Sequence, residues 1–124
     1  MAFHNLLGEE GEKIAVRYLK SKGYIVYQTN WRFGKLEIDI IAEDGQELVF
    51  IEVKTRSSEI YGRPEEAVDD AKETAILNAA DIYVRDFNLE VEVRFDIISV
   101  LMNKNKSKIC HIIDAFSGID QAYY

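Results

Sequence analysis

Charged side chains stand directly beside the most apolar stretch of the chain, a position in which they need a partner. Glu52 and Lys54 follow the run 48–51, Leu-Val-Phe-Ile, and the alternation of side chains along a strand places both charges on one face with Leu48 and Phe50. A buried charge costs several kcal/mol unless it is paired or binds a metal ion. The spacing therefore indicates either a structural ion pair or a site that holds a cation.

A second carboxylate is expected close to Glu52. Asp39 lies in the alternating run 36–42, Leu-Glu-Ile-Asp-Ile-Ile-Ala, and Asp44-Gly45 is a strong signal for a hairpin turn between this run and the next. Two carboxylates that meet repel each other, and the repulsion raises a pKa unless a cation lies between them. Mg²⁺ and Mn²⁺ suit such a site because they bind carboxylate oxygens, backbone carbonyl oxygens and water.

These residues can be given chemical roles. Asp39, Glu52 and the backbone of Val53 are the candidate metal ligands. A divalent ion at this position polarises a phosphate and lowers the pKa of water, and Lys54 would position that water or balance the developing negative charge. Glu12 falls within the apolar sector of the first helix on a helical wheel, so it can supply a further carboxylate.

Each of these assignments has a structural alternative. An E-x-K triplet occurs by chance in many proteins, and Glu52 with Lys54 could form an ion pair at the end of a strand. Glu12 could be an exposed charge at the margin of the apolar stripe, and Glu37 is expected to face solvent or to contact the ligands only indirectly. Structural roles are expected for four further polar residues: Arg94 and Asp96, which pair along one strand, His111 in an edge strand, and Cys110 in packing.

The hydrophobic pattern predicts the elements that position these residues. Apolar residues at helical spacing indicate a first helix over 6–22, which Gly23 ends. Strands are predicted over 24–29, 36–42, 46–56, 90–102 and 108–114. A second helix starts in the segment 61–66, with Pro64 in its first turn, and its predicted inner stripe is Val68, Ala71, Ala75, Ala79 and Ile82. The order α-β-β-β-α-β-β predicts a single α/β domain over residues 1–124, with a mixed central sheet flanked by helices.

The composition limits the classes of protein to which this chain can belong. The 124 residues suffice for one domain, and 48% of them are apolar or aromatic, enough for a core. The one cysteine excludes an intramolecular disulfide, and no window approaches the ~20 apolar residues of a membrane span. These features predict a soluble, cytoplasmic protein with no membrane partner. The net charge of −7 opposes general nucleic-acid binding, which depends on lysine and arginine, although carboxylates gathered for a metal ion also produce an acidic excess.

A set of motifs runs in order along nearly the whole chain. They are Gly11-Glu12 with Ala15 and Tyr18-Leu19, Gly23-Tyr24, Asn30-Trp31-Arg32, Glu37-Ile38-Asp39-Ile40-Ile41-Ala42, the run 48–56, Tyr61-Gly62-Arg63-Pro64, and Arg94-Phe95-Asp96. The stretches 37–42 and 48–56 are the most specific of them. Together the motifs resemble the YraN family, an uncharacterised family placed in the restriction-endonuclease-like, or PD-(D/E)xK, superfamily, near the archaeal Holliday-junction resolvases.

The resemblance implies a restriction-endonuclease-like fold and a set of residue roles. Asp39 and Glu52 would bind Mg²⁺ or Mn²⁺, and Lys54 would be the catalytic lysine. Glu12 would match the helix glutamate of the resolvase-like branch, and Lys72 on the second helix would be an accessory phosphate contact.

One position departs from the pattern of many relatives. They have glycine directly before the Glu-Ile-Asp of 37–39, whereas this chain has Leu36 there and Gly34 earlier. The difference would alter the local strand geometry or the approach of DNA. It leaves the acidic residues in place.

These inferences lead to three hypotheses about function. The first is a metal-dependent endonuclease that hydrolyses DNA phosphodiester bonds, on branched or structured substrates such as Holliday junctions, with DNA favoured over RNA and a homodimer if the assembly also resembles the resolvases. The second is a nucleic-acid-binding module without turnover, and the third is an adaptor for another protein, which the net charge of −7 favours. The candidate phosphate contacts, each of which is otherwise a solvated surface charge, are Arg17, Lys20, Arg32, Lys35, Arg56 and Arg63.

Overall fold

The computed structural model describes residues 2–57, 68–103 and 106–116, with side chains from residue 7 onward. Its elements follow the predicted order of helix, three strands, helix and two strands. They are α1 (Ala2–Ser21), β1 (Ile25–Phe33), β2 (Leu36–Asp44), β3 (Glu47–Arg56), α2 (Asp70–Asp86), β4 (Glu92–Asn103) and β5 (Lys106–Phe116).

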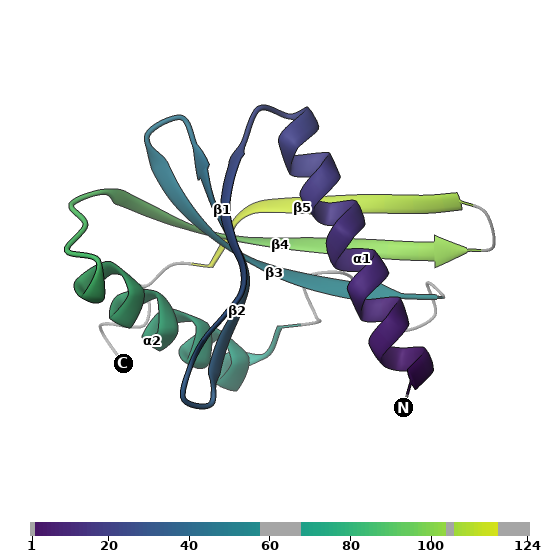
Figure 1. Cartoon of the computed structure of the whole chain (residues 1–124), viewed down its shortest axis with the longest axis horizontal. Coiled ribbons are helices and arrows are strands. Elements are labelled where there is room, and N and C mark those ends of the chain that lie inside the picture. The colour runs from purple at the N-terminus through teal and green to yellow at the C-terminus, as the bar shows by residue number, and fades with distance from the viewer. Residues whose placement is uncertain (1, 58–67, 104–105, 117–124) are drawn as a thin grey trace.

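The five strands form one mixed sheet in the order β1-β2-β3-β4-β5. The β3–β4 pair is parallel and the other neighbouring pairs are antiparallel. Parallel neighbours need a crossover connection, and α2 lies in the connection between β3 and β4. Figure 1 shows β3, β4 and β5 running across the molecule while the β1–β2 hairpin stands upright against them. The predicted mixed α/β architecture is confirmed.

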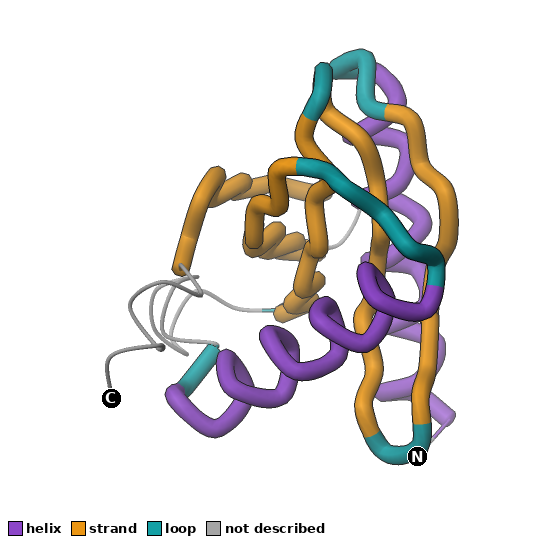
Figure 2. Tube along the Cα trace, turned by 90° about the vertical axis from the view of Figure 1, so that its left-hand side faces the viewer, coloured by secondary structure: helices purple, strands orange, loops and turns teal. Residues whose placement is uncertain are grey.

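The two helices cover opposite faces of the sheet and bury separate cores (Figure 2). The α2-side core contains Phe50 and Phe95 with Tyr83 of the helix. The α1-side core contains Leu19 with Val49, Ile51 and residues of β4. The predicted alternation of β3 is therefore confirmed, because Phe50 lies on one face and its neighbours Val49 and Ile51 lie on the other.

The buried side of α2 differs from the predicted stripe. Its buried residues are Ile76, Ala79, Ala80 and Tyr83. Val68 and Ala79 are buried as expected, but Ala71 is exposed, Ala75 and Ile82 are half-buried, and Val68 lies ahead of the helix. The larger Ile76 and Tyr83 bury more apolar area than alanines do, so their sector faces the sheet.

The ends of the elements follow local chemistry. Gly23, at φ 92°, lies in the turn that follows α1, one residue after Lys22, and the helix ends there as predicted. The described part of α2 begins at Asp70. Asp69 caps this end of the helix, because its side chain accepts a hydrogen bond from the Lys72 backbone N–H. The predicted helix start at 61–66 lies outside the described residues. β1 runs on to Phe33 rather than ending at 29, because an edge strand can keep polar side chains in water.

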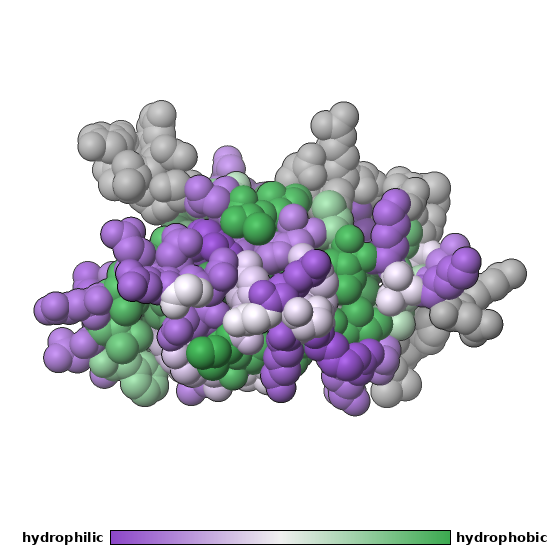
Figure 3. Space-filling model, turned by 90° about the horizontal axis from the view of Figure 1, so that it is seen from above, coloured by the Kyte–Doolittle hydropathy of each residue, from purple (hydrophilic) through white to green (hydrophobic). Residues whose placement is uncertain are grey.

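The surface carries apolar residues in separate places. The large exposed ones are Ile25, Tyr27, Phe33, Phe87, Val91 and Ile113. On the face shown in Figure 3, hydrophobic residues form distinct patches among hydrophilic ones. None of the described helices has the length and apolar character that crossing a membrane requires.

Candidate active site

The candidate active site lies where β2 separates from β3. Backbone pairing of the two strands runs from Asp44↔Glu47 to Ile40↔Ile51, and the next residues are Asp39 and Glu52. Beyond that point a side chain takes the place of the backbone acceptor that a paired strand would offer. The Val53 backbone N–H donates a hydrogen bond to Asp39 Oδ2 at 2.8 Å. In a strand the N–H and C=O of one residue point to the same side. The Val53 carbonyl therefore also faces the gap beside Asp39.

A change of side in β2 presents Asp39 to this gap. Ile38 packs in the α2-side core and Ile40 packs in the α1-side core, although residues two apart in a regular strand share a face. The strand thus twists over at Asp39.

Asp39 and Glu52 form a tightly coupled acidic pair. Burial and the negative charge of Asp39 raise the pKa of Glu52 to about 7, and a hydrogen bond with Asp39 contributes to the rise. Burial also raises the pKa of Asp39, although the hydrogen bond from Val53 opposes this shift. Two such groups either share a proton near neutral pH or hold a cation in its place. The predicted proximity of the two carboxylates is confirmed.

Glu12 approaches the pair from α1. Its pKa is raised by burial and by the negative charge of Asp39, while a hydrogen bond from the Asn30 side chain lowers it. The helix comes close enough because Gly11 packs directly on Thr55 of β3, with no room for a side chain between them. Sequence reasoning placed Glu12 near the apolar stripe but did not single out Asn30 as its partner.

These residues surround one hollow of about 300 Å³. It is lined by Leu7, Gly8, Glu12, Asp39, Glu52, Val53, Lys54 and Thr55. Among the described residues, no group of three histidine, cysteine or acidic side chains is gathered into a ready-made metal cluster. Two carboxylates and one carbonyl nevertheless fit Mg²⁺, which typically uses one or two carboxylates and fills its other positions with water and substrate phosphate. The donor set thus fits Mg²⁺ or Mn²⁺.

The two lysines of the site have different positions. Lys54 is exposed and lines the hollow. Lys72, at the start of α2, places its Nζ 3.5 Å from Glu52 Oε1, with side chains that are 47% and 11% exposed. Glu52 therefore pairs with Lys72, and the alternative, a structural ion pair of Glu52 with Lys54, does not form among the described residues.

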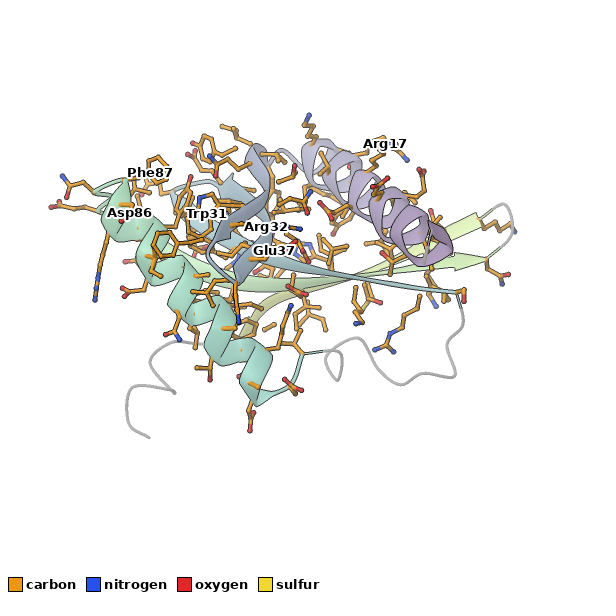
Figure 4. All side chains as sticks on the ribbon, turned by 60° about the horizontal axis from the view of Figure 1, so that its bottom comes forward. Arg17, Trp31, Arg32, Glu37, Asp86 and Phe87 are labelled. Atoms are coloured by element: carbon orange, nitrogen blue, oxygen red, sulfur yellow. The ribbon has the colours of Figure 1, made fainter. Side chains whose placement is uncertain are left out.

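Two of the other predicted phosphate contacts lie beside acids outside the Asp39–Glu52 pair. Arg17 on α1 is 4.0 Å from Glu10, and Arg32 on the hairpin is 3.4 Å from Glu37. Figure 4 shows Arg17 well separated from Arg32, which lies beside Glu37. Lys20 and Lys35 are exposed, Arg56 is half-buried at the end of β3, and Arg63 lies outside the described residues. Lys72 is the candidate phosphate contact for which the described residues show an ion pair with Glu52.

A second polar cluster lies under the end of α1. Arg94 donates to both oxygens of Asp96, as predicted, and also to Tyr24, Asp44 and Glu47. His111 Nε2 lies 2.7 Å from Asp96, and its Nδ1 lies 3.0 Å from the Tyr18 hydroxyl. This cluster ties α1 to β4 and β5, which agrees with a structural role for His111. Cys110 was expected in packing, but it is exposed because it points to the opposite face of an edge strand from His111.

Comparison with known proteins places the chain in a family. Residues 11–100 match the model described as "Uncharacterised protein family UPF0102". A UPF0102 protein of Bacteroides thetaiotaomicron is 48% identical over 116 residues, which cover 94% of this chain and 96% of the relative. A UPF0102 protein of Flavobacterium psychrophilum is 47% identical over 94% of this chain and 98% of the relative. The matched segment includes α1 from Gly11, both helices' contacts with the sheet, and all the candidate ligands. This chain therefore belongs to the uncharacterised protein family UPF0102.

Proposed function

We propose that the protein is a Mg²⁺- or Mn²⁺-dependent endonuclease that hydrolyses phosphodiester bonds in DNA. The observation that carries this proposal is the Asp39–Glu52 pair, held by the Val53 backbone at the point where β2 and β3 separate. Glu12 and Lys54 line the same hollow. A pair of buried carboxylates open to a polar hollow is better explained by a cation that enters than by stability, since the two negative charges repel each other and burial disfavours both of them.

The chain's own residues divide the work of hydrolysis. A bound Mg²⁺ or Mn²⁺ ion would polarise the phosphate and lower the pKa of the attacking water. The Val53 N–H holds the Asp39 carboxylate in place at 2.8 Å, and the Lys72 ammonium lies 3.5 Å from Glu52. Lys54 reaches into the hollow from the solvent side, where its ammonium group can neutralise charge that develops on the phosphate.

We further propose that the fold belongs to the restriction-endonuclease-like superfamily. Three features support the placement: a helix ahead of three antiparallel strands, a crossover helix into a parallel neighbour of the third strand, and acids at the separation of the second and third strands. A fold by itself does not fix a function. The retained acids and lysines are therefore the stronger support for catalysis.

One observation favours a second candidate, an adaptor that binds another protein. The net charge of −7 repels a phosphate backbone, and several arginines already pair with acids. A nuclease with this charge would depend on the metal ion and on a few lysines to hold its substrate. A binding module without turnover fits less well, because it has no use for two carboxylates that repel each other.

The test is a cleavage assay with Mg²⁺ or Mn²⁺ on single-stranded, duplex, flap and four-way-junction DNA, labelled at one end. The control is Glu52→Gln, which removes a ligand charge at nearly constant shape. We expect the wild type to cleave at least one substrate, and the variant to cleave none.

A thermal melt with Mn²⁺ separates the candidates further. A ligand that binds only the folded state raises the melting temperature, so the wild type should shift and Asp39→Asn should not. A folded protein with a Mn²⁺ shift and no cleavage of any substrate would contradict the nuclease proposal. No shift in the wild type would remove the metal site and leave the adaptor as the better candidate.

A further inference from the structure

Asn30 holds its backbone in a conformation that few side chains adopt. It lies in β1 with φ at 54°, in the left-handed region, which asparagine tolerates better than most residues but which still costs free energy. Among the described non-glycine residues only Asn88 and Asp114 share this feature. An outlier of this kind within a strand indicates that the surrounding structure holds the residue there for a purpose.

The conformation turns the Asn30 side chain toward α1. Thr29 and Asn30 are consecutive, yet both line a hollow of about 510 Å³ between α1 and β1, together with Glu12. Consecutive side chains of a regular strand point to opposite faces, so the positive φ breaks the alternation here. Trp31, the next residue, packs edge-to-face on Tyr83 of α2 on the other side of the sheet.

Asn30 and Glu12 line the same hollow between α1 and β1. Burial and the negative charge of Asp39 raise the pKa of Glu12, whereas a hydrogen bond from the Asn30 side chain lowers it. Glu12 also lines both hollows, the one beside Asn30 and the one beside Asp39. The Asn30 amide therefore offsets the repulsion from Asp39 and holds the carboxylate at the boundary between the two hollows.

Asn30 and Asp39 stand at the same level of the hairpin. Thr29 pairs with Ile40 and Trp31 pairs with Ile38, which leaves Asn30 across from Asp39. Both strands change sides at this level, β1 at Asn30 and β2 at Asp39. The twist of the hairpin at this level thus places both the Asn30 amide and the Asp39 carboxylate near Glu12 of α1.

We propose that Asn30 is a positioning residue, whose side-chain amide holds the Glu12 carboxylate beside Asp39 at the mouth of the candidate active site. Its catalytic meaning rests on the proposed nuclease function. The contact between Asn30 and Glu12 can be tested without that function.

The first test compares Asn30→Gly with the matched control Asn88→Gly. Glycine adopts a positive φ without steric cost, so Asn30→Gly keeps the strand path and removes only the amide. Asn88 has φ at 52° and is exposed beyond α2. We expect similar melting temperatures for both variants and a loss of about tenfold to 100-fold in kcat for Asn30→Gly alone, because a misplaced catalytic group costs this much. Cleavage by Asn30→Gly at the rate of Asn88→Gly would overturn the proposal.

A double-mutant cycle asks whether Asn30 acts through Glu12. We expect Glu12→Ala to lower kcat, and Asn30→Gly to add less than about a twofold loss in that background, since residues that act as a unit are not additive. Multiplied losses in the double variant would show that Asn30 acts on something other than Glu12. That result would overturn the proposal and leave the nuclease function standing.

The second test needs neither metal nor activity. The Asn30 side-chain amide gives its own NMR signals, which shift when a hydrogen bond to a carboxylate is lost. We expect Glu12→Ala to move these signals and Glu9→Ala, at another residue that lines the same hollow, to leave them in place. Signals that ignore Glu12→Ala would overturn the proposal. If the wild type cleaves no DNA but the signals respond to Glu12→Ala, the nuclease function fails while the positioning contact is upheld.

Discussion

Gly11 of α1 lies so close to Thr55 of β3 that a Cβ at residue 11 would stand 1.9 Å from Thr55 Oγ1 and 2.9 Å from its Cβ. Two non-bonded atoms cannot lie this close together. The helix backbone can therefore approach β3 only because residue 11 is a glycine. Glu12 is the next residue of the helix and Lys54 is the residue before Thr55. The close approach therefore sets the distance across the hollow that both residues line.

Gly11→Ala should destabilise the protein and push α1 away from the site. Overpacking costs about 1–3 kcal/mol, and the better helix propensity of alanine returns about 1 kcal/mol of this. Urea unfolding measures the net loss. Gly8→Ala is the matched control in the same helix, where nothing lies within 4 Å of the added Cβ. It should be neutral or slightly stabilising, and an equal effect of the two substitutions would refute the steric argument.

Arg94→Met should be among the most damaging substitutions outside the candidate site. Arg94 is 8% exposed and faces Asp96, which is 0% exposed. Its removal leaves a buried carboxylate without its cation, which costs about 3–5 kcal/mol in such settings. Arg94→Met with Asp96→Asn should recover part of the loss, because the stranded charge is then gone.

Arg85→Met provides the contrast for the Arg94 substitution. Arg85 pairs with Asp81 at 3.1 Å along the exposed side of α2, with side chains that are 76% and 57% exposed. Exposed pairs of this kind are worth about 0.3–0.5 kcal/mol. A loss from Arg94→Met no larger than that from Arg85→Met, in the same urea experiment, would contradict the assigned role of the buried cluster.

The acidic pair could be predicted because short-range signals determine it. Asp44-Gly45 sets the hairpin and its register, and the apolar run of β3 marks a central strand, so Asp39 and Glu52 must arrive at the same level. Strand alternation then places Glu52 on the face of Phe50. These signals depend on residues close in sequence, and the packing of the core favours the same turn and the same strand register.

The remaining contacts of the site depend on packing that no local pattern encodes. Lys72 reaches Glu52 only because of the way α2 sits on the sheet, and its buried side was itself mispredicted. The approach of Gly11 to Thr55 needs the position of α1 over β3. A positive φ at Asn30 leaves no mark in the hydrophobic pattern, since asparagine is common in turns and loops as well.

Glu52→Gln should flatten the dependence of stability on pH. The pKa of Glu52 is raised from 4.5 to about 7, chiefly by burial and by Asp39. A folded state that binds its proton more tightly than the unfolded state is favoured below the unfolded pKa, and this contribution is lost as pH rises through about 7. In EDTA, the wild type should therefore lose more stability than Glu52→Gln between about pH 5 and about pH 8.

The comparison for this prediction is Glu90→Gln, at an exposed glutamate between α2 and β4. It should follow the wild-type curve of stability against pH. The groups that titrate away from the acidic pair are present in all three proteins, so they cancel in the differences. Asp39 titrates together with Glu52, so the measured difference belongs to the pair. Parallel curves for the wild type and Glu52→Gln would mean that Glu52 is ionised over the whole range, contrary to the raised pKa.

Lys72→Gln should tighten the binding of Mn²⁺ while it weakens any cleavage. The Lys72 ammonium lies 3.5 Å from Glu52 and repels a divalent ion at that carboxylate. Two unit charges about 4 Å apart interact by ~1 kcal/mol even in water, so the repulsion of a doubly charged ion is ~2 kcal/mol. Its removal predicts Mn²⁺ binding about 30-fold tighter. The titration is read from the signal of free Mn²⁺ above about pH 8, which lies above the Glu52 pKa of about 7 in the wild type. Lys35→Gln, in the exposed β1–β2 turn, should leave the affinity unchanged, and Asp39→Asn should abolish it. Weaker Mn²⁺ binding by Lys72→Gln would show instead that Lys72 holds Glu52 in its binding position.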